Sequence, residues 1–331
     1  MSSLSHKIDF AIIFSVNHAN PNGDPLNGNR PRTDYDGFGE VTDVCLKRKI
    51  RDRLQEQKQT IFVQSDEKKT DGMTSLKNRA ESAEYGLGKE AFGFDGKDNT
   101  PDKVKEKACE KWFDVRAFGQ VFAWKTEKKK AKKVKKGQQS DIEEIASDSE
   151  GKEEGENVSG DGVSIAIRGP VTIQSAFSLE PVSITSTQIT KSVNSEGDGS
   201  KKGSDTMGMK HRVDHAIYVT YGAITPQLAD KTGFSDDDAE TIKAILPKLF
   251  EGDASSARPE GSMAIKKVIW WQHDCKSGRH SSANVHGKLS NLIDLWKNNP
   301  ETIVEQIEAL TPDNKTVLEF EDLNVEVING F

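Results

Sequence analysis

The sequence holds few cysteines and no long apolar run, and both scarcities narrow the class of protein. Its three cysteines, Cys45, Cys109 and Cys275, lie far apart and form neither a disulfide framework nor a CxxC metal motif. No apolar stretch approaches the roughly 20 residues that a membrane span requires. The first residues also lack the apolar core of a signal peptide. We therefore expect a cytoplasmic protein with reduced cysteines and no membrane partner.

An excess of positive charge is missing as well. The 331 residues include 46 Lys and Arg against 53 Asp and Glu, which gives a net charge of -7. Nucleic-acid-binding domains are usually basic, so any nucleic-acid site here must be a local basic patch on an acidic body. Nucleotide-binding (Walker), GxSxG and HExxH motifs are absent, and so is the literal RRM signature.

Residues 125–162 differ sharply in composition from the rest of the chain. A lysine block at 125–136 precedes an acidic block at 141–156, and almost nothing between them suits a core. Such segments usually stay unfolded, so we expect a disordered charged loop. It could act as a basic tail that touches nucleic acid. The favoured interpretation is a solvated insertion whose two charge blocks neutralise each other.

Hydrophobic periodicity predicts strands interleaved with helices. Alternation over 8–16 indicates a strand with at least one buried face. Ser235 and Asp238 form a capping box for a helix that extends to Phe250. Further strands are predicted at 112–124, 163–167, 171–179, 182–190, 215–221, 263–271 and 316–327, with mostly helical residues over 58–112 and a helix after Pro300. This order favours an α+β fold with one mostly antiparallel sheet and helices on one face.

The helix predicted over 43–58 carries cations beside its apolar stripe. Thr42 precedes it and is a suitable N-cap. On a helical wheel, Lys47, Arg48 and Arg51 lie on one flank of the stripe. A helix start that combines exposed amides with fixed cations suits phosphate. The alternative is an ordinary solvated face, and periodicity alone does not decide between the two.

Two loops could add contacts to nucleic acid. The Asn-, Gly- and Pro-rich loop before this helix contains Arg30 and Arg32, which are spaced by a proline and could fork onto phosphates or bases. A surface Arg–Asp pair is the alternative. The loop 191–212 is long and polar until Met207, and an apolar tip on a polar arm could wedge between bases. The alternative is a methionine that anchors the loop to the core.

Metal chemistry has two sets of candidate ligands. Three loop aspartates, Asp24, Asp34 and Asp36, could hold a divalent cation and support phosphodiester cleavage. Aspartate is also the usual turn residue, which is the simpler interpretation. A zinc site is not expected, because the four candidate ligands lack CxxC or HxxxH spacing: His273, Cys275, His280 and His286.

Several short strings along the chain carry a family resemblance. They occur in order between about residue 8 and residue 290, at 20–25, 29–34, 41–52, 114–119, 167–171, 204–208 and 257–263. Together they resemble the backbone subunit of type I-C and I-B CRISPR Cascade complexes, the Cas-seven, Csd-two-like family. The resemblance implies an RRM-like (ferredoxin-like) antiparallel-sheet palm with a helical insertion and a protruding thumb loop.

The same resemblance implies how the chain is divided. The expected order is 1–57 for the start of the palm with its Gly/Asn-rich loop and basic helix, 58–112 for the helical insertion, 113–124 for a palm strand, 125–162 for the charged loop, 163–190 for palm strands, 191–212 for the thumb loop, and 213–331 for the remaining palm and C-terminal helices.

A function follows from the resemblance. Copies would stack head to tail on a guide RNA, each holding the sugar-phosphate backbone and flipping one nucleotide under its neighbour's thumb. Sequence would then be read by pairing of the guide with target DNA. The implied RNA-contacting residues are Arg30, Arg32, Lys47, Arg48, Arg51, Arg168, Gln174, Ser175, Met207, Lys210, Arg212 and Arg258.

The resemblance also implies partners and leaves alternatives. The expected partners are the CRISPR guide RNA, target DNA through the guide, further copies of the chain, the large Cascade subunit and the repeat-processing endonuclease subunit. No cofactor, metal or catalytic residue is expected. A metal-dependent ribonuclease that uses the loop aspartates is the first alternative, and a lone RNA chaperone outside any complex is the second.

Overall fold

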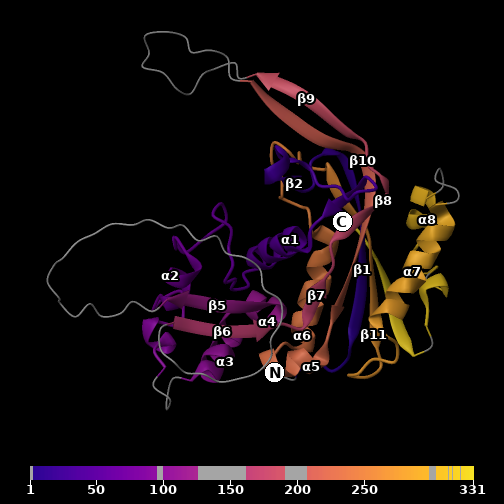
Figure 1. The fold of residues 1–331 in the computed structure, drawn as a ribbon. Helices are drawn as coiled ribbons and strands as arrows, with labels where there is room; N and C mark the ends of the chain where they lie inside the picture. Colours follow the sequence, from indigo (N-terminus) through magenta and orange to yellow (C-terminus); the bar gives the residue numbers. More distant parts are fainter. Residues whose placement is uncertain are drawn as a thin grey trace, which may run out of the picture.

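The fold is that of a computed structural model, which describes residues 3–94, 100–125, 162–190, 207–297, 303–311, 313–314, 316–320 and 322–331. Figure 1 shows the arrangement of its elements. In chain order they are β1 (Ile8–Ala19), β2 (Gly23–Asp24), η1 (Pro25–Asn27), β3 (Arg30–Pro31), β4 (Phe38–Val41), α1 (Asp43–Glu56), α2 (Leu76–Glu81), η2 (Lys89–Phe92), α3 (Pro101–Lys111), α4 (Phe113–Phe118), β5 (Gly119–Lys125), β6 (Gly162–Arg168), β7 (Val171–Ile173), β8 (Ala176–Pro181), β9 (Ile184–Thr190), β10 (Met207–Ile224), α5 (Pro226–Thr232), α6 (Asp236–Ile245), η3 (Leu246–Lys248), β11 (Met263–His273), α7 (Ser282–Lys297), α8 (Ile303–Ala309), η5 (Thr316–Leu318) and β12 (Leu323–Asn329).

One antiparallel sheet organises most of the described chain. Its strands follow the order β12-β11-β1-β10-β8-β4, and β7 and β9 also pair with β10. In β1, Phe10 lies opposite Gly222 of β10 and Trp270 of β11. A Cβ at Gly222 would lie 2.2 Å from the Phe10 ring, so glycine is what lets the ring cross its neighbour. The predicted α+β fold with a large antiparallel sheet is confirmed.

Helices cover both faces of this sheet, not one. Phe10 and Ile12 of β1 belong to the core beneath α1 and α6, whereas Ile13 belongs to a second core beneath α7 and α8 (Figure 1). The prediction of helices on one face is therefore wrong. Both sets of alternating positions in β1 are apolar, and a strand buried on both faces reads in that way. Helix α7 was not predicted.

The inserted part of the chain has a small core of its own. Phe62, Trp112, Phe122 and Ile165 pack together there, and β5 pairs with β6 in a separate two-stranded sheet. The interval 113–124, predicted as a palm strand, instead contains α4 followed by β5. In the described chain, strand β6, predicted within the palm, pairs with β5 and not with the large sheet. Aromatic residues fill helix and strand alike here, so the sequence indicated Gly119 as an interruption of a strand but not as the change from helix to strand.

Gly119 marks the point where helix α4 passes into strand β5. It has a φ of 81°, a conformation that residues with a side chain rarely adopt. A Cβ at this position would also lie 2.2 Å from the carbonyl oxygen of Ile167. Glycine therefore permits both the reversal of the chain and the close pairing of β5 with β6.

A hairpin of β9 and β10 projects beyond the sheet (Figure 1). Strand β10 pairs with β9 from Met207 to Val213 and with β1 from Val213 to Ile224. Residues 207–212 were predicted as part of a loop, but they are strand. Residues 191–206 of that predicted loop lie outside the described residues, as does most of the charged loop predicted at 125–162.

The helix N-caps predicted from the sequence are confirmed, but some ends of helices and strands differ from the prediction. Thr42 caps α1 by accepting a hydrogen bond from the Cys45 N–H, and Ser235 and Asp238 form the predicted capping box of α6. Helix α6 ends at Ile245, earlier than predicted. Residues 316–318 are 3-10 helix instead of strand. Within the described residues, no helix combines the length and apolarity needed to cross a bilayer.

The two-sided burial of β1 leads to a stability prediction. Ile12 and Ile13 are each 0 % exposed but lie in different cores. We expect Ile12→Ala and Ile13→Ala each to lower the free energy of unfolding by about 2–5 kcal/mol, measured by urea denaturation. Val44→Ala, at a side chain that is 70 % exposed, should change it by less than about 0.5 kcal/mol. A negligible effect of Ile13→Ala alone would contradict the second core.

Candidate nucleic-acid interface

The loop before α1 is built by its asparagines. The Asn22 side-chain oxygen accepts hydrogen bonds from the Thr42 N–H (3.0 Å) and the Thr42 hydroxyl (2.9 Å). The Asn20 side chain donates to the Asn29 carbonyl at 2.7 Å. These bonds join the loop to the start of α1, so the arginines of the loop and the first turns of the helix share one surface.

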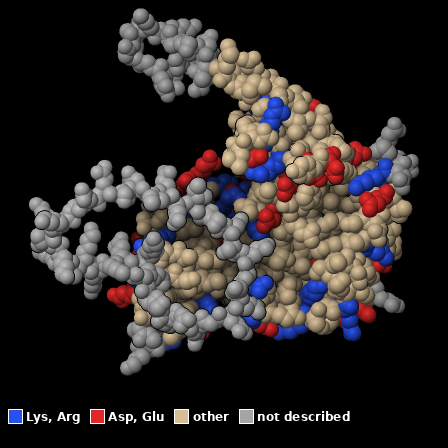
Figure 2. All heavy atoms as spheres, in the orientation of Figure 1, with Lys and Arg blue, Asp and Glu red and all other residues tan. Residues whose placement is uncertain are grey.

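Four cations lie on the loop before α1, on α1 itself and on the segment before β11, and we call them the basic corner: Arg30, Arg32, Lys47 and Arg258. Arg30 is exposed on β3, which lies against β10. The backbone N–H of Asn20 donates to the Ala257 carbonyl at 2.9 Å, which brings the segment before Arg258 to this loop. In Figure 2, Lys and Arg atoms gather in a recess beside α1 with acidic atoms around them.

Three members of the basic corner have acidic neighbours. Lys47 pairs with Asp43 at 2.9 Å and Arg32 with Asp24 at 3.3 Å. The Arg258 Nε donates to Asp253 at 3.1 Å, and Asp253 also pairs with Lys49 of α1. Partly exposed pairs of this kind are weak and yield readily to a stronger anion such as phosphate. Lys49 and Asp253 are 204 positions apart, so no sequence pattern signalled their contact.

Cys45 of α1 lies within the field of this corner. Burial raises the pKa of its thiol, while the charges of Lys49, Arg258 and Arg32 act to lower it. These three cations come from distant parts of the chain and act on one atom. Arg32 and Arg258 therefore lie on the same side of α1 as Cys45 and Lys49.

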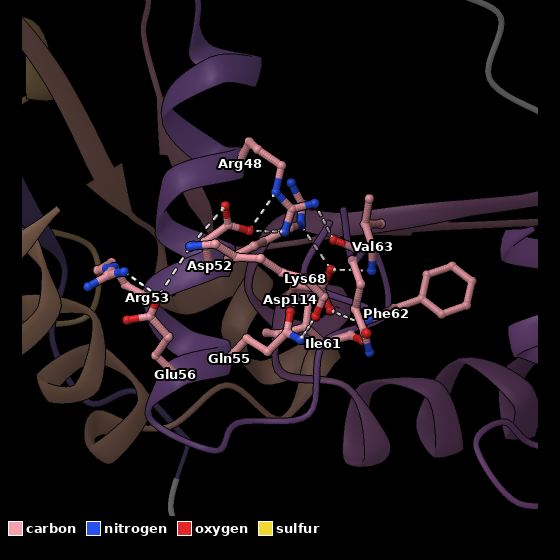
Figure 3. A network of polar contacts seen from close by, with 12 residues as sticks. Arg48, Asp52, Arg53, Gln55, Glu56, Ile61, Phe62, Val63, Lys68 and Asp114 are labelled. Carbon is pink, nitrogen blue, oxygen red and sulfur yellow. Dashed lines mark hydrogen bonds and ion pairs between the residues drawn. The ribbon is translucent and has the colours of Figure 1, made fainter. Parts of the chain in front are cut away.

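Arg48 and Arg51, predicted on the basic flank of α1, are instead engaged within the fold: Arg48 in the polar network of Figure 3, and Arg51 by Asp114. The Arg48 Nε donates to Asp52 at 2.9 Å, and its Nη1 donates to the Val63 carbonyl. Burial lowers the pKa of Arg48, and the neighbouring Asp52 acts to raise it. The helical wheel placed these arginines beside the apolar stripe correctly but could not show that the insertion covers them.

Asp114 is the centre of that network. Its carboxylate is 1 % exposed and accepts hydrogen bonds from the Phe62 N–H (2.7 Å), the Val63 N–H (3.0 Å) and the Arg51 Nε (2.9 Å). The Arg51 guanidinium also lies over the Phe118 ring at 5.1 Å. Asp114 thus joins α1, the segment after it and α4. Asp114 begins the string 114–119 noted in the sequence, but the sequence around it did not predict this role.

The projecting hairpin exposes apolar side chains on both of its faces. Met207 and Met209 are 67 % and 54 % exposed on one face, and Ile189, which pairs with Gly208, is 49 % exposed on the other. Lys210 follows Met209 and is exposed, while Arg212 lies 3.5 Å from Asp214. In the described part of the hairpin, Met207 is therefore not anchored in a core.

Of the remaining predicted site residues, Arg168 lies apart from the basic corner, whereas Gln174 and Ser175 directly precede Ala176, which pairs with Val41 just before α1. Arg168 is exposed at the end of β6 and lines a groove of about 1080 Å³ between α3, β6 and α5. Gln174 is exposed between β7 and β8, and its backbone is tied to Tyr221 and Thr220 of β10. Ser175 beside it is half-buried. The fold thus does not bring Arg168 together with Arg30.

The loop aspartates have local partners. Asp24 accepts a hydrogen bond from the Leu26 N–H at 3.2 Å, in addition to its contact with Arg32. Asp34 accepts from the N–H groups of Asp36 (3.0 Å) and Phe38 (2.8 Å). Two of the three aspartates therefore act as turn residues. Among the described residues, no group of three or more His, Cys, Asp or Glu could hold a metal ion.

These features define a class of fold. The chain is an α+β protein with one large antiparallel sheet, helices on both faces, an inserted subdomain and a projecting hairpin. The model of the CRISPR-associated protein Cas7 family matches residues 6–327. The chain therefore belongs to the CRISPR-associated Cas7 family.

The chain is also similar to individual proteins. A curated relative from Haloferax volcanii, CRISPR-associated protein Cas7, is 25% identical over 303 residues, which cover 90% of this chain and 78% of the relative. A chain of a CRISPR RNA-guided surveillance complex in a pre-nicking state aligns over 88% of both chains at 15% identity, with a TM-score of 0.43. A chain of the type III-B Cmr-beta complex bound to cognate target RNA aligns over 80% of this chain and 60% of that chain at 8% identity, with a TM-score of 0.38.

The buried network predicts that two neighbouring cations of α1 differ in their effect on stability. Arg51→Ala leaves the Asp114 carboxylate buried without its cation, and we expect a loss of about 3–5 kcal/mol in the free energy of unfolding. Lys47→Ala removes a partly exposed pair and should cost less than about 1 kcal/mol.

Urea denaturation gives both values, and hydrogen exchange adds a local test. In Arg51→Ala the amides of Phe62 and Val63 should exchange faster relative to the β1 amides, because their common acceptor has lost its fixed position. Equal stability of the two variants would show that the Arg51–Asp114 contact does not hold the insertion.

Proposed function

We propose that this protein is a guide-RNA-binding backbone subunit of a type I CRISPR surveillance complex, in the type I-C form of Cascade. Membership of the Cas7 family over residues 6–327 carries the proposal. Several copies stack along the spacer of one guide RNA and present it for pairing with target DNA. The subunit has a structural and RNA-binding role and no catalytic one.

The basic corner contacts the phosphates of the guide. Arg30 is exposed, and Arg32, Lys47 and Arg258 have only partly exposed acidic neighbours that phosphate can replace. Contacts to phosphate carry no sequence information, as a subunit that serves any guide requires. Arg48 and Arg51 have a different role, because they hold the insertion against α1.

The hairpin and the palm supply the remaining contacts. Met207 wedges against a base, and Lys210 and Arg212 reach the adjacent phosphates. Exposed apolar side chains on a projecting arm are what such a wedge requires. Arg168, Gln174 and Ser175 contact other nucleotides of the guide RNA.

The partners follow from this role. They are the guide RNA, target DNA through the guide, further copies of the chain, the large Cascade subunit and the repeat-processing endonuclease subunit, all in the cytoplasm. The division into palm, insertion and thumb is part of the same proposal.

The ribonuclease alternative has less support. Asp24 and Asp34 accept hydrogen bonds from backbone N–H groups of their own turns, which accounts for their presence in the loop. Asp36 is exposed, and its backbone N–H donates to Asp34 within the same turn.

Co-expression with a repeat–spacer transcript and partner subunits tests the proposal. We expect a large particle on sizing, with extracted RNA of uniform length. Arg30→Ala combined with Lys210→Ala should weaken RNA binding and lower the slope of log K against log salt by about 1 per cation removed, because each cation releases a counterion.

The matched control removes two exposed lysines of α7, on the other face of the sheet. Lys288→Ala with Lys297→Ala changes the net charge equally and should leave both particle and slope unchanged. A monomer free of RNA in the presence of all partners would overturn the proposal. Magnesium-dependent RNA cleavage that is lost in Asp36→Asn would favour the ribonuclease instead.

A further inference from the structure

A second hollow lies away from the basic corner, at the end of α1. It has a volume of about 300 Å³ and is bounded by the C-terminal turn of α1, the segment 58–71, α2 and Trp112. This volume is at the lower end of the range for small-molecule sites. It admits one ring system with its substituents and is too small for a helix or strand of a partner protein.

The lining of this pocket is rich in amides. Gln55, Gln59 and Gln64 all contribute to it. Gln64 is engaged within the fold, because it donates to the Ile61 carbonyl and accepts from the Thr70 N–H, each at 3.0 Å. Gln55 donates to the Lys68 carbonyl at 2.6 Å, and within the described chain its Oε1 is buried without a hydrogen-bond partner. That oxygen has almost no surface open to a ligand, so the half-buried Gln59 is the amide of the lining that a ligand would meet.

Two aromatic residues supply the walls. Tyr85 is 38 % exposed, and Trp112, which is 1 % exposed, is held from behind by the Phe62 ring at a centroid distance of 4.6 Å. Lys58 is an exposed cation at the rim and has a φ of 64°. The pocket therefore combines flat apolar surfaces, amide groups and one available positive charge.

The charge of the lining separates the classes of ligand. Asp71 is the one carboxylate of the lining, and Arg79 engages both of its oxygens. It is not available to accept from the hydroxyls of a sugar. Glutamine amides match the donor and acceptor edges of nucleobases, and aromatic side chains stack on their faces. A cation at the rim suits the attached phosphate.

We propose that this pocket binds one unpaired nucleobase, at a site separate from the basic corner. Tyr85 stacks on the ring, Gln59 meets its polar edge, and Lys58 faces the phosphate. The base belongs either to a bound single strand or to a free nucleotide, and the chemistry of recognition is the same for both.

Binding of nucleotides to the full-length protein tests this site without requiring assembly of the complex. AMP and UMP, titrated separately and followed by ligand-observed NMR, should bind, whereas ribose 5-phosphate, which lacks the base, should not. Tyr85→Ala should weaken AMP binding about tenfold through loss of stacking, and Tyr85→Phe should retain most of it. Tyr35→Ala, at a fully exposed tyrosine elsewhere on the surface, is the control and should have no effect.

Each further outcome has a definite meaning. Equal binding of ribose 5-phosphate and AMP would overturn the site as a base pocket, and so would AMP binding that survives both Tyr85→Ala and Gln59→Ala. Tighter binding of a hexanucleotide than of AMP, lost in Tyr85→Ala, would identify a strand as the source of the base. Equal affinity for the two would identify a free nucleotide. Particle assembly is scored separately, so failure of the pocket leaves the backbone role intact and the reverse also holds.

Discussion

The contact between Asp114 and Arg51 is the interaction on which the arrangement of the two parts of the chain depends. A single buried carboxylate accepts from Arg51 of α1 and from the consecutive N–H groups of Phe62 and Val63. Isolated charges are costly to bury, so this carboxylate is stable only where all three donors converge. The segment after α1 is thereby held against α1 and α4, and this segment leads into the insertion.

The same network divides the cations of α1 by role. Arg48 and Arg51 are directed inward, Lys49 is buried with Asp253, and Lys47 remains at the surface. A helix that reads as uniformly basic thus presents far less positive charge to solvent than its composition suggests. The net charge of -7 counts paired and exposed groups alike, so it does not report how much positive charge remains at the surface. An RNA-binding surface on such a protein must be small and depend on several segments at once.

The features that could be predicted from the sequence are those with a local cause. Thr42 and Ser235 cap helices through bonds to residues three positions away, so their signals lie within one short window. The strand at the start of the chain was also evident from its apolar alternation. Whether one or both faces of that strand are buried depends on α7, which is more than 250 positions away, and no local pattern reports it. The pairing of Arg51 with Asp114 and of Lys49 with Asp253 could not be predicted for the same reason.

The candidate site shows a similar limit. Arg30, Arg32 and Lys47 could be predicted as candidates because they lie within 20 residues of one another, and in the structure Asn22 bonds Thr42 and so joins the loop to α1. The aromatic-rich interval 112–124 was misassigned because Trp and Phe suit a strand and a buried helix equally. The lining of the pocket beside Trp112 comes from four separated segments, none of which carries a motif. Only the fold brings its three glutamines together.

Strand β10 links the large sheet to the projecting hairpin. Its 18 residues form both an inner strand of the sheet, paired with β1, and one arm of the projecting hairpin. The change of partner occurs at Val213, which is 0 % exposed, so the hairpin emerges from a fixed point of the core. A wedge carried by a continuous strand has its direction set by the sheet, whereas a wedge at the tip of a free loop would not. The position of Met207 relative to the basic corner is therefore a property of the sheet itself.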